Sequence, residues 1–255
     1  MTLSPLIIAH RGASAYAPEN TLAAFRLAIK QGADGIEFDV RLSKDGVPIV
    51  IHDSNLRRVS GHNLRVDELT AAELSKVDVG SWFNRVRGDT LYAGETIPTL
   101  DETLAVASAV PGPIYIELKC NAANYRPLVQ TVCNVIPDSA LLPRIIVKSF
   151  RRTAVAEVRH LLPEVQTAAL FEPRIMRVIR KRKYIIDMAR DFGAHQISLH
   201  RSLATPRICA LAAEAGFPIT IWTADDPKWI ERCHSRGIGA VITNDPPRML
   251  GRRDS

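Results

Sequence analysis

Residues 35–53 read GIEFDVRLSKDGVPIVIHD, with two apolar arms on either side of an Asp-Gly pair at positions 45–46. An Asp-Gly pair between strand-like arms is a strong signal for a β-hairpin with a two-residue turn. Pairing about that turn sets Asp39 directly opposite His52. Opposed residues share a face of a sheet, as do residues two apart along one strand. The stretch therefore predicts that Glu37, Asp39 and His52 project together.

The chain on both sides of this hairpin repeats one pattern, in which a short apolar run is followed by a turn and a helical segment. Nearly continuous apolar runs are typical of strands buried on both faces in parallel sheets. The helical segments have readable starts, such as the capping-box spacing of Thr99 and Glu102. The pattern predicts an α/β fold, a closed (β/α)8 TIM barrel, with a doubly wound open sheet as the alternative. The eight predicted strands are Leu6–Ala9, Gly35–Val40, Ile114–Leu118, Ile145–Val147, Ala168–Phe171, Gln196–Leu199, Ile219–Trp222 and Ala240–Thr243.

Length and composition fit a single catalytic domain. The chain has 255 residues, of which 46% are hydrophobic and 24% charged, the usual balance of a globular protein. We expect residues 1–255 to form one domain. Residues 54–98 are too long for an ordinary barrel loop, so we expect them to form a small capping insertion. Its Trp82 and Phe83 are expected to contribute to a small core of its own.

Charge and cysteine usage exclude several classes of protein. Lys and Arg number 33 against 27 Asp and Glu, and the net charge of +6 permits an anionic partner without requiring one. The basic run Arg174–Lys183 is expected to be a solvated helix face, with a surface site for an anion as the alternative. Because aromatic residues there are confined to Tyr184, we predict no nucleic acid partner. The partner that we predict is a small-molecule substrate. Four cysteines without a CxxC pair exclude a zinc knuckle and a disulfide framework. With no signal peptide or long apolar run, we predict a cytoplasmic protein without stable membrane insertion, either monomeric or a homodimer.

Acidic residues stand at or near the ends of predicted strands, where barrel enzymes place their reactive groups. Glu37, Asp39 and Glu117, brought close together, would repel one another and raise at least one carboxyl pKa. One divalent cation, Mg²⁺ or Ca²⁺, resolves this conflict because both ions prefer oxygen ligands. We therefore predict a metal site. The alternative is a set of salt bridges to nearby cations, namely Arg11, Arg41 and Lys119.

Two histidines flank these carboxylates in the predicted barrel. His10 and His52 could act as an acid–base pair, because one can accept a proton while the other donates one. His200, at another strand end, remains a candidate. Three carboxylates with one divalent ion leave a charge of about −1, and Arg11 and Lys119 add two positive charges, a balance that suits a singly charged phosphodiester. Trp222 offers an apolar wall for an alcohol group or, alternatively, belongs to the barrel core.

At these residues the sequence resembles the glycerophosphodiester phosphodiesterase family, within the phospholipase-C-like phosphodiesterase barrels. The resemblance spans nearly the whole chain, and its first two signatures together are highly specific. The matching segments are His10-Arg11-Gly12, Pro18-Glu19-Asn20-Thr21, Glu37-Phe38-Asp39-Val40, Val50-Ile51-His52-Asp53, Ile97-Pro98-Thr99-Leu100, Ile116-Glu117-Leu118-Lys119, Ser149-Phe150, Trp222-Thr223 and Ile242-Thr243-Asn244-Asp245-Pro246.

The resemblance implies metal-dependent hydrolysis of glycerophosphodiesters to glycerol 3-phosphate and an alcohol. It assigns metal binding to the three carboxylates, acid–base catalysis to the two histidines, phosphate binding to Arg11 and Lys119, and contact with glycerol to Trp222. Asn20 would order the first loop, as a helix cap or near the phosphate. Two positions depart from the family pattern. Asp225 replaces a frequent Asn, and Lys148 replaces a neutral residue, which leads to the hypothesis that Lys148 near the rim biases headgroup choice.

Two other functions compete with this interpretation. One is a lyase-type phospholipase that acts on lipid phosphodiesters and releases a cyclic phosphate. The other is a non-catalytic barrel that binds glycerophosphodiesters or other anions, whose expected sign, the loss of a histidine or carboxylate, is absent from the sequence. Within the leading interpretation we expect His10 to be the base and His52 the acid. The sequence leaves open whether water or a glycerol hydroxyl attacks first.

Overall fold

The computed structural model describes residues 4–88, 90–136, 140–177 and 183–254, so residues 178–182 of the basic run Arg174–Lys183 lie outside the described part of the chain. Nine strands form one sheet. They are β1 (Leu6–His10), β2 (Gly35–Leu42), β3 (Pro48–Val50), β4 (Ile114–Leu118), β5 (Ile145–Ser149), β6 (Gln166–Phe171), β7 (Gln196–His200), β8 (Ile219–Trp222) and β9 (Ala240–Thr243).

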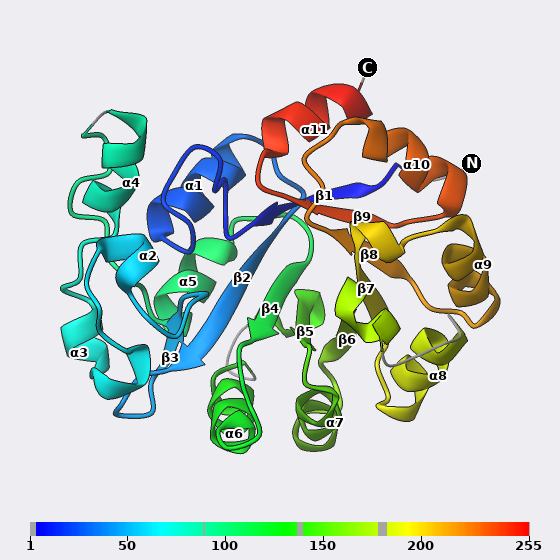
Figure 1. Cartoon of the computed structure of the whole chain (residues 1–255), viewed down its shortest axis with the longest axis horizontal. Helices are drawn as coiled ribbons and strands as arrows, with labels where there is room; N and C mark the ends of the chain where they lie inside the picture. The colour runs from blue at the N-terminus through cyan, green and yellow to red at the C-terminus, as the bar shows by residue number, and fades with distance from the viewer. Residues whose placement is uncertain (1–3, 89, 137–139, 178–182, 255) are drawn as a thin grey trace.

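The sheet closes into a barrel. Its order is β1-β9-β8-β7-β6-β5-β4-β2-β3, and an additional parallel pairing of β1 with β2 joins the two ends of the eight-stranded parallel set. Only β3 is antiparallel, paired to β2 as a hairpin arm. The pairing confirms the predicted (β/α)8 barrel and excludes the open doubly wound sheet (Figure 1).

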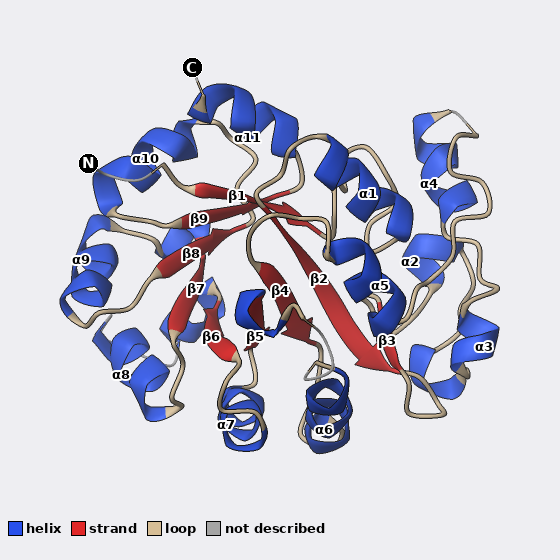
Figure 2. Ribbon diagram, turned by 180° about the vertical axis from the view of Figure 1, so that it is seen from behind, coloured by secondary structure: helices blue, strands red, loops and turns tan. Residues whose placement is uncertain are grey.

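Helices surround this barrel on its outside (Figure 2). Those that cover the barrel are α1 (Leu22–Lys30), α5 (Leu100–Ala107), α6 (Tyr125–Val135), α7 (Arg152–Leu161), α8 (Lys183–Asp191), α9 (Pro206–Glu214), α10 (Lys228–Arg236) and α11 (Pro246–Arg253). The predicted capping box at the start of α5 is confirmed, since Thr99 and Glu102 bond each other's backbone N–H groups. Within the described residues, no helix is long and apolar enough to cross a membrane.

The hairpin after β2 differs from the prediction by one residue. Val40 pairs with Val50, and Ser43 N donates to Val47 O, so the loop between the arms has three residues and ends in Gly46 with φ of 78°. A glycine in the left-handed region is what such a three-residue loop requires. The predicted pairing of Asp39 with His52 is therefore wrong. A shift of one residue moves each side chain to the other face of the sheet.

Between β3 and α5 the chain forms a separate layer of short helices: α2 (Arg57–Ser60), α3 (Ala71–Leu74) and α4 (Gly80–Arg87). They lie beside β2 and β3, at the left of Figure 1. A cluster of buried aliphatic side chains holds this layer together. The cluster consists of Ile49, Ile51, Leu56, Val66, Leu74, Val79 and Ile97. Trp82 and Phe83 are half-buried at the edge of this cluster, where Phe83 packs edge-on against Tyr92 of the same segment.

Candidate active site

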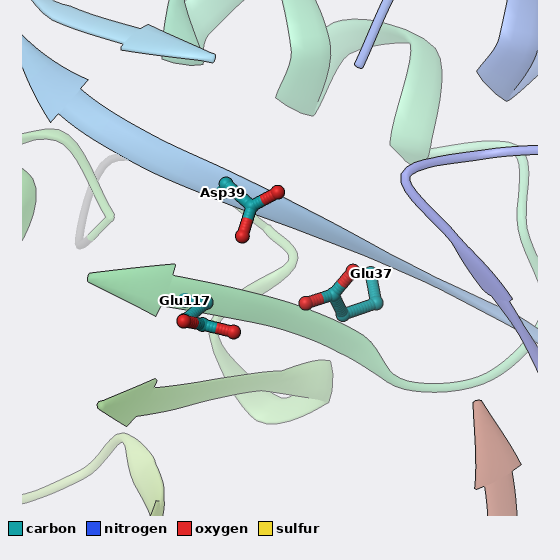
Figure 3. A group of neighbouring side chains, drawn as sticks. All are labelled: Glu37, Asp39 and Glu117. Atoms are coloured by element: carbon teal, nitrogen blue, oxygen red, sulfur yellow. The ribbon is translucent and has the colours of Figure 1, made fainter. Parts of the chain in front are cut away.

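The strand register places charged side chains side by side inside the barrel. Asp39 on β2 is in register with Glu117 on β4, which is in register with Lys148 on β5. One layer below, Glu37 pairs with His10 on β1. In-register residues of parallel strands point to the same side, so these side chains all enter the interior. Oxygens of Glu37, Asp39 and Glu117 lie within 4.8 Å of one another, and all three residues are buried (Figure 3).

Cations accompany each of these buried carboxylates. Lys119 Nζ lies 3.1 Å from Asp39 Oδ1 and also contacts Glu117 Oε1, and Arg11 Nε lies 3.0 Å from Asp39 Oδ2. Burial acts to raise the pKa of Asp39. The charges of Lys119 and Arg11 outweigh burial and hold that pKa below its usual range. Burial acts to lower the pKa of Lys119, but the carboxylates of Asp39 and Glu117 raise it above its usual value.

Lys148 is not at the rim, and the expectation that it meets the headgroup there is wrong. β5 continues through Ser149, two residues further than predicted, so Lys148 is a strand residue inside the barrel and only 1% exposed. Its Nζ lies 2.8 Å from Glu37 Oε1 and 3.9 Å from Glu117 Oε2. Burial acts to raise the pKa of Glu37, but Lys148 and His10 bring it below its usual value. Lys148 therefore compensates the charges of Glu37 and Glu117 from inside the barrel.

The three carboxylates fit a divalent cation. Their ligand atoms converge, and among the described residues one buried oxygen of each carboxylate has no partner other than the ammonium group of Lys119 or Lys148. Carboxylate oxygens are the ligands that Mg²⁺ and Ca²⁺ prefer. The alternative of salt bridges is present as well, although with Lys148 in place of the expected Arg41. The donor set thus suits a metal ion whose carboxylate ligands are also held by ammonium groups.

The loop after β1 brings Arg11 and Asn20 to Asp39. Arg11 and Asn20 have left-handed φ values of 57° and 58°, which are uncommon for residues other than glycine. Between them, a Cβ at Gly12 would lie 2.5 Å from the carbonyl carbon of Ala24, so the loop packs tightly onto α1. Asn20 Nδ2 donates to Asp39 Oδ2 at 2.9 Å.

Asn20 is not a helix cap, which corrects one of the two alternatives for this residue. Thr21 caps α1 instead, because its hydroxyl accepts from Ala24 N. The change follows from geometry, since the cap residue has extended backbone angles and Asn20 is left-handed. Asn20 is therefore free to position the carboxylate of Asp39.

His10 is held by an amide. Its Nδ1 lies 2.7 Å from Asn244 Oδ1, and Asn244 Nδ2 donates to Asp225 Oδ2 at 2.9 Å. Since a carboxylate only accepts, Asp225 fixes the amide with its oxygen toward His10. His10 Nδ1 must then donate, and the neutral ring carries its lone pair on Nε2, which lies 3.9 Å from Glu37 Oε2.

His52 is held by a carboxylate. It follows β3 in a loop, where Arg41 Nε donates to its carbonyl oxygen at 2.8 Å, and its Nδ1 donates to Asp53 Oδ1 at 2.6 Å. Burial lowers the pKa of His52, and the charges of Lys119 and Arg11 act in the same direction. Asp39 and the hydrogen bond to Asp53 oppose that change. These interactions place His52 beside the carboxylates although the predicted strand pairing is wrong.

An aromatic cluster lies on another part of the barrel mouth. The ring of Trp222 at the end of β8 meets Phe150 edge-on at 5.5 Å and His200 at 5.3 Å between centroids. His200 Nδ1 bonds Ser202 Oγ at 2.8 Å, so its ring joins Trp222 and Ser202 rather than the carboxylates. Trp222 Nε1 is buried without a hydrogen-bond partner in the described chain.

Sequence reasoning missed the residues that orient the two imidazoles. Asn244 follows β9 and Asp225 follows β8. A position shortly after a strand end was the sequence signal that could have identified both as site residues. Asp53 follows His52 directly, and Arg58 Nε on α2 donates to Asp53 Oδ2 at 2.6 Å. Arg58 could not have been found from spacing, because its role depends on how the 54–98 segment folds back.

Comparison with known proteins shows which family the chain resembles in sequence. The sequence profile of the glycerophosphoryl diester phosphodiesterase family matches residues 10–248. The chain belongs to this family. The match includes the strand ends that carry both histidines and all three carboxylates, and it confirms the resemblance found in the sequence.

Members of the family resemble this chain over their whole length. The glycerophosphodiester phosphodiesterase of Caldanaerobacter subterraneus is 30% identical, with 97% of each chain covered. That of Bacillus subtilis is 34% identical over 96% of this chain and 86% of its own length. A phosphodiesterase from Oleispira antarctica, solved with the product sn-glycerol-3-phosphate, has a TM-score of 0.86 at 28% identity and covers 99% of this chain and 98% of its own.

Proposed function

We propose that this family member is a metal-dependent phosphodiesterase that hydrolyses glycerophosphodiesters to glycerol 3-phosphate and an alcohol. The observation that supports it is a pair of imidazoles, His10 and His52, held by different partners beside one buried carboxylate cluster. Such a pair can accept a proton from a nucleophile and deliver one to a leaving alkoxide. The solved relative named with sn-glycerol-3-phosphate agrees with this product.

Glu37, Asp39 and Glu117 would hold the divalent cation, which when bound supplies positive charge that stabilises the phosphate in the transition state. Arg11 and Lys119 would bind the phosphate oxygens from the same side, because both cations already face these carboxylates. Guanidinium and ammonium donors make strong charge-assisted bonds to phosphate.

His10 is the base in this proposal. Its Nδ1 donates to Asn244, so Nε2 is the atom that accepts the proton of the attacking hydroxyl. The new bond joins that oxygen to phosphorus, and the bond from phosphorus to the leaving alcohol oxygen breaks.

His52 is the acid. Its bond to Asp53 stabilises the protonated ring, from which Nε2 gives its proton to the departing oxygen. Trp222 and Phe150 would contact the glycerol carbons, since they form an apolar wall at the mouth. We further propose that residues 54–98 act as a cap over the His52 side of the mouth, where Arg58 connects α2 to Asp53.

A coupled assay for glycerol 3-phosphate tests the proposal. The enzyme is stripped with EDTA, Mg²⁺ and Ca²⁺ are added back in turn, and several glycerophosphodiesters are compared. We expect activity to disappear on chelation and to return with one of the two ions. Phosphorus NMR of the products separates hydrolysis from the lyase reaction, because accumulation of a cyclic phosphate as the final product contradicts the proposal. Absence of turnover with every diester and both ions would favour a binding barrel.

A further inference from the structure

A basic cavity of about 750 Å³ opens between the barrel rim and the 54–98 segment. Arg41 of β2, Ser54, Arg57 and Arg58 of α2, and Trp82 of α4 contribute to its lining. Its volume is within the range of about 300–1,000 Å³ that is usual for small-molecule sites. Neither the three carboxylates nor the Trp222 cluster lines it. It is therefore a compartment beside the reaction centre.

The cavity adjoins His52. Arg41, which contributes to its wall, donates from Nε to the carbonyl oxygen of His52 and from NH1 to that of Lys119. Asp53, also in its lining, accepts a hydrogen bond from His52 Nδ1. A diester whose phosphate lies at the carboxylates has two arms. If the glycerol arm contacts Trp222 on β8, the arm protonated by His52 leaves toward this cavity.

The charges of the cavity do not balance. Asp53 and Arg58 satisfy each other, and Arg58 also makes two bonds to Glu19. Within the described chain the side-chain bonds of Arg41 go to the two carbonyl oxygens, and the carboxylates nearby, Asp53 and Asp39 among them, act on its charge without bonding it. Arg57, which is exposed, has no carboxylate partner among the residues that the structure describes. The lining thus carries three guanidinium groups, those of Arg41, Arg57 and Arg58, against the single carboxylate of Asp53.

We propose that this cavity binds the leaving alcohol of the substrate when that alcohol carries a second phosphate group. The inference rests on the proposed function. Arg41 and Arg57 would bind the second phosphate, because a guanidinium matches phosphate oxygens with paired N–H donors. The Ser54 hydroxyl is available for a polar group between the two phosphates, and the ring of Trp82 closes one wall. The enzyme then favours headgroups with added negative charge.

Two substrates that differ by one added glycerophosphate unit test this inference. Glycerophosphoglycerol has a neutral headgroup, whereas bis(glycerophospho)glycerol carries the same alcohol extended by a second phosphodiester. The measured quantity is a ratio of initial kcat/KM values at low salt. The value for bis(glycerophospho)glycerol is divided by the value for glycerophosphoglycerol. In the native protein we expect a ratio above one, falling as salt is raised because the cavity is open to solvent.

Arg57→Gln should lower that ratio about fivefold, the size expected for loss of one charge-assisted contact. Lys76→Gln is the matched control, since it removes one positive charge from an exposed residue of the same segment that does not line the cavity. Melting curves establish that both variants are folded. Competitive inhibition of glycerophosphoglycerol turnover by 2,3-bisphosphoglycerate gives a second measurement, and its Ki should rise in Arg57→Gln but not in Lys76→Gln.

The outcomes separate the two proposals. Failure to hydrolyse either diester overturns the proposed function. Turnover of glycerophosphoglycerol with a ratio that Arg57→Gln leaves unchanged, or that both variants lower equally, overturns the cavity assignment alone. Equal effects of the two variants would mean that general surface charge, rather than this cavity, attracts the anion.

Discussion

The two histidines beside the carboxylate cluster are held by partners of different charge. His10 ends a barrel strand, and its Nδ1 faces a neutral amide, Asn244, fixed by Asp225. His52 lies in the loop after β3, and its Nδ1 faces a carboxylate, Asp53, which Arg58 holds from the 54–98 segment. An amide orients the neutral ring, whereas a carboxylate also stabilises the charged ring. The difference favours His10 as base and His52 as acid.

The comparison also shows where each support comes from. The partners of His10 lie in the short connections that directly follow β8 and β9. The support of His52 reaches outside the barrel, through Asp53 to Arg58 and from there to Glu19 in the first loop. The acid is therefore coupled to the fold of an added segment, while the base depends on residues that directly follow two barrel strands.

The largest expected effect is the loss of either imidazole. His10→Ala and His52→Ala should each lower kcat by at least about 10², in line with the usual contribution of acid–base catalysis. Steady-state assays with glycerophosphocholine measure the loss. His160→Ala, an exposed position on the outer helix α7, is the control and should retain full activity.

A better leaving group separates the two roles. A p-nitrophenyl glycerophosphate needs little protonation as it departs, so His52→Ala should regain most of its activity on this substrate and His10→Ala should not. The reverse pattern would exchange the assignments of acid and base. Equal losses on both substrates would show that the different supports do not produce different roles.

Removing the amide behind His10 should have the next largest effect. Asn244→Leu keeps the approximate volume but leaves Nδ1 of His10 without its acceptor, so the ring loses its fixed orientation. We expect kcat/KM to fall about 10–100-fold, as is usual when the partner of a functional imidazole is removed. Because the base is affected, the p-nitrophenyl substrate should not restore activity. An unchanged kcat/KM would contradict the orienting role.

Replacing the carboxylate beside His52 should change the pH profile. The hydrogen bond to Asp53 raises the pKa of His52 against the lowering effect of burial. If protonated His52 is the acid, activity is lost as the pH rises through that pKa. Asp53→Asn removes the supporting charge, so the alkaline limb of kcat/KM should move to lower pH. The control is Asp67→Asn, elsewhere in the segment and paired with Arg65, which should leave the alkaline limb in place. An alkaline limb that stays fixed in both variants argues against His52 as the titrating acid.

The smallest effect is expected from a redundant contact on the His10 side. Ser14 Oγ donates to Asn244 Oδ1 at 3.0 Å, but Asp225 already fixes that amide. Ser14→Ala should lower kcat/KM only about twofold, the value of one neutral hydrogen bond. A loss as large as that of Asn244→Leu would show that Ser14, rather than Asp225, sets the orientation.

Local sequence patterns predicted single helices and strands more accurately than the pairing and position of these elements in the fold. The capping box at Thr99 and Glu102 depends on residues three apart, and the structure has it as predicted. The hairpin register was wrong because an Asp-Gly pair fits both a two-residue turn and the last two positions of a three-residue loop. Lys148 was placed at the rim because the apolar run ends at Val147, although a buried carboxylate allows the strand to continue through a lysine.

The sequence by itself determined that parallel strands alternate with helices and that acidic, basic and imidazole groups stand at or near strand ends, because periodicity and residue type are local properties. Tertiary structure alone decided that the sheet closes, that Lys148 pairs with Glu37 inside the barrel, and that Asn244 and Asp53 orient different histidines. These relations join segments far apart in the chain or depend on the path of a loop. Strand register and packing fix these contacts, and the periodicity of the sequence encodes neither the register nor the packing.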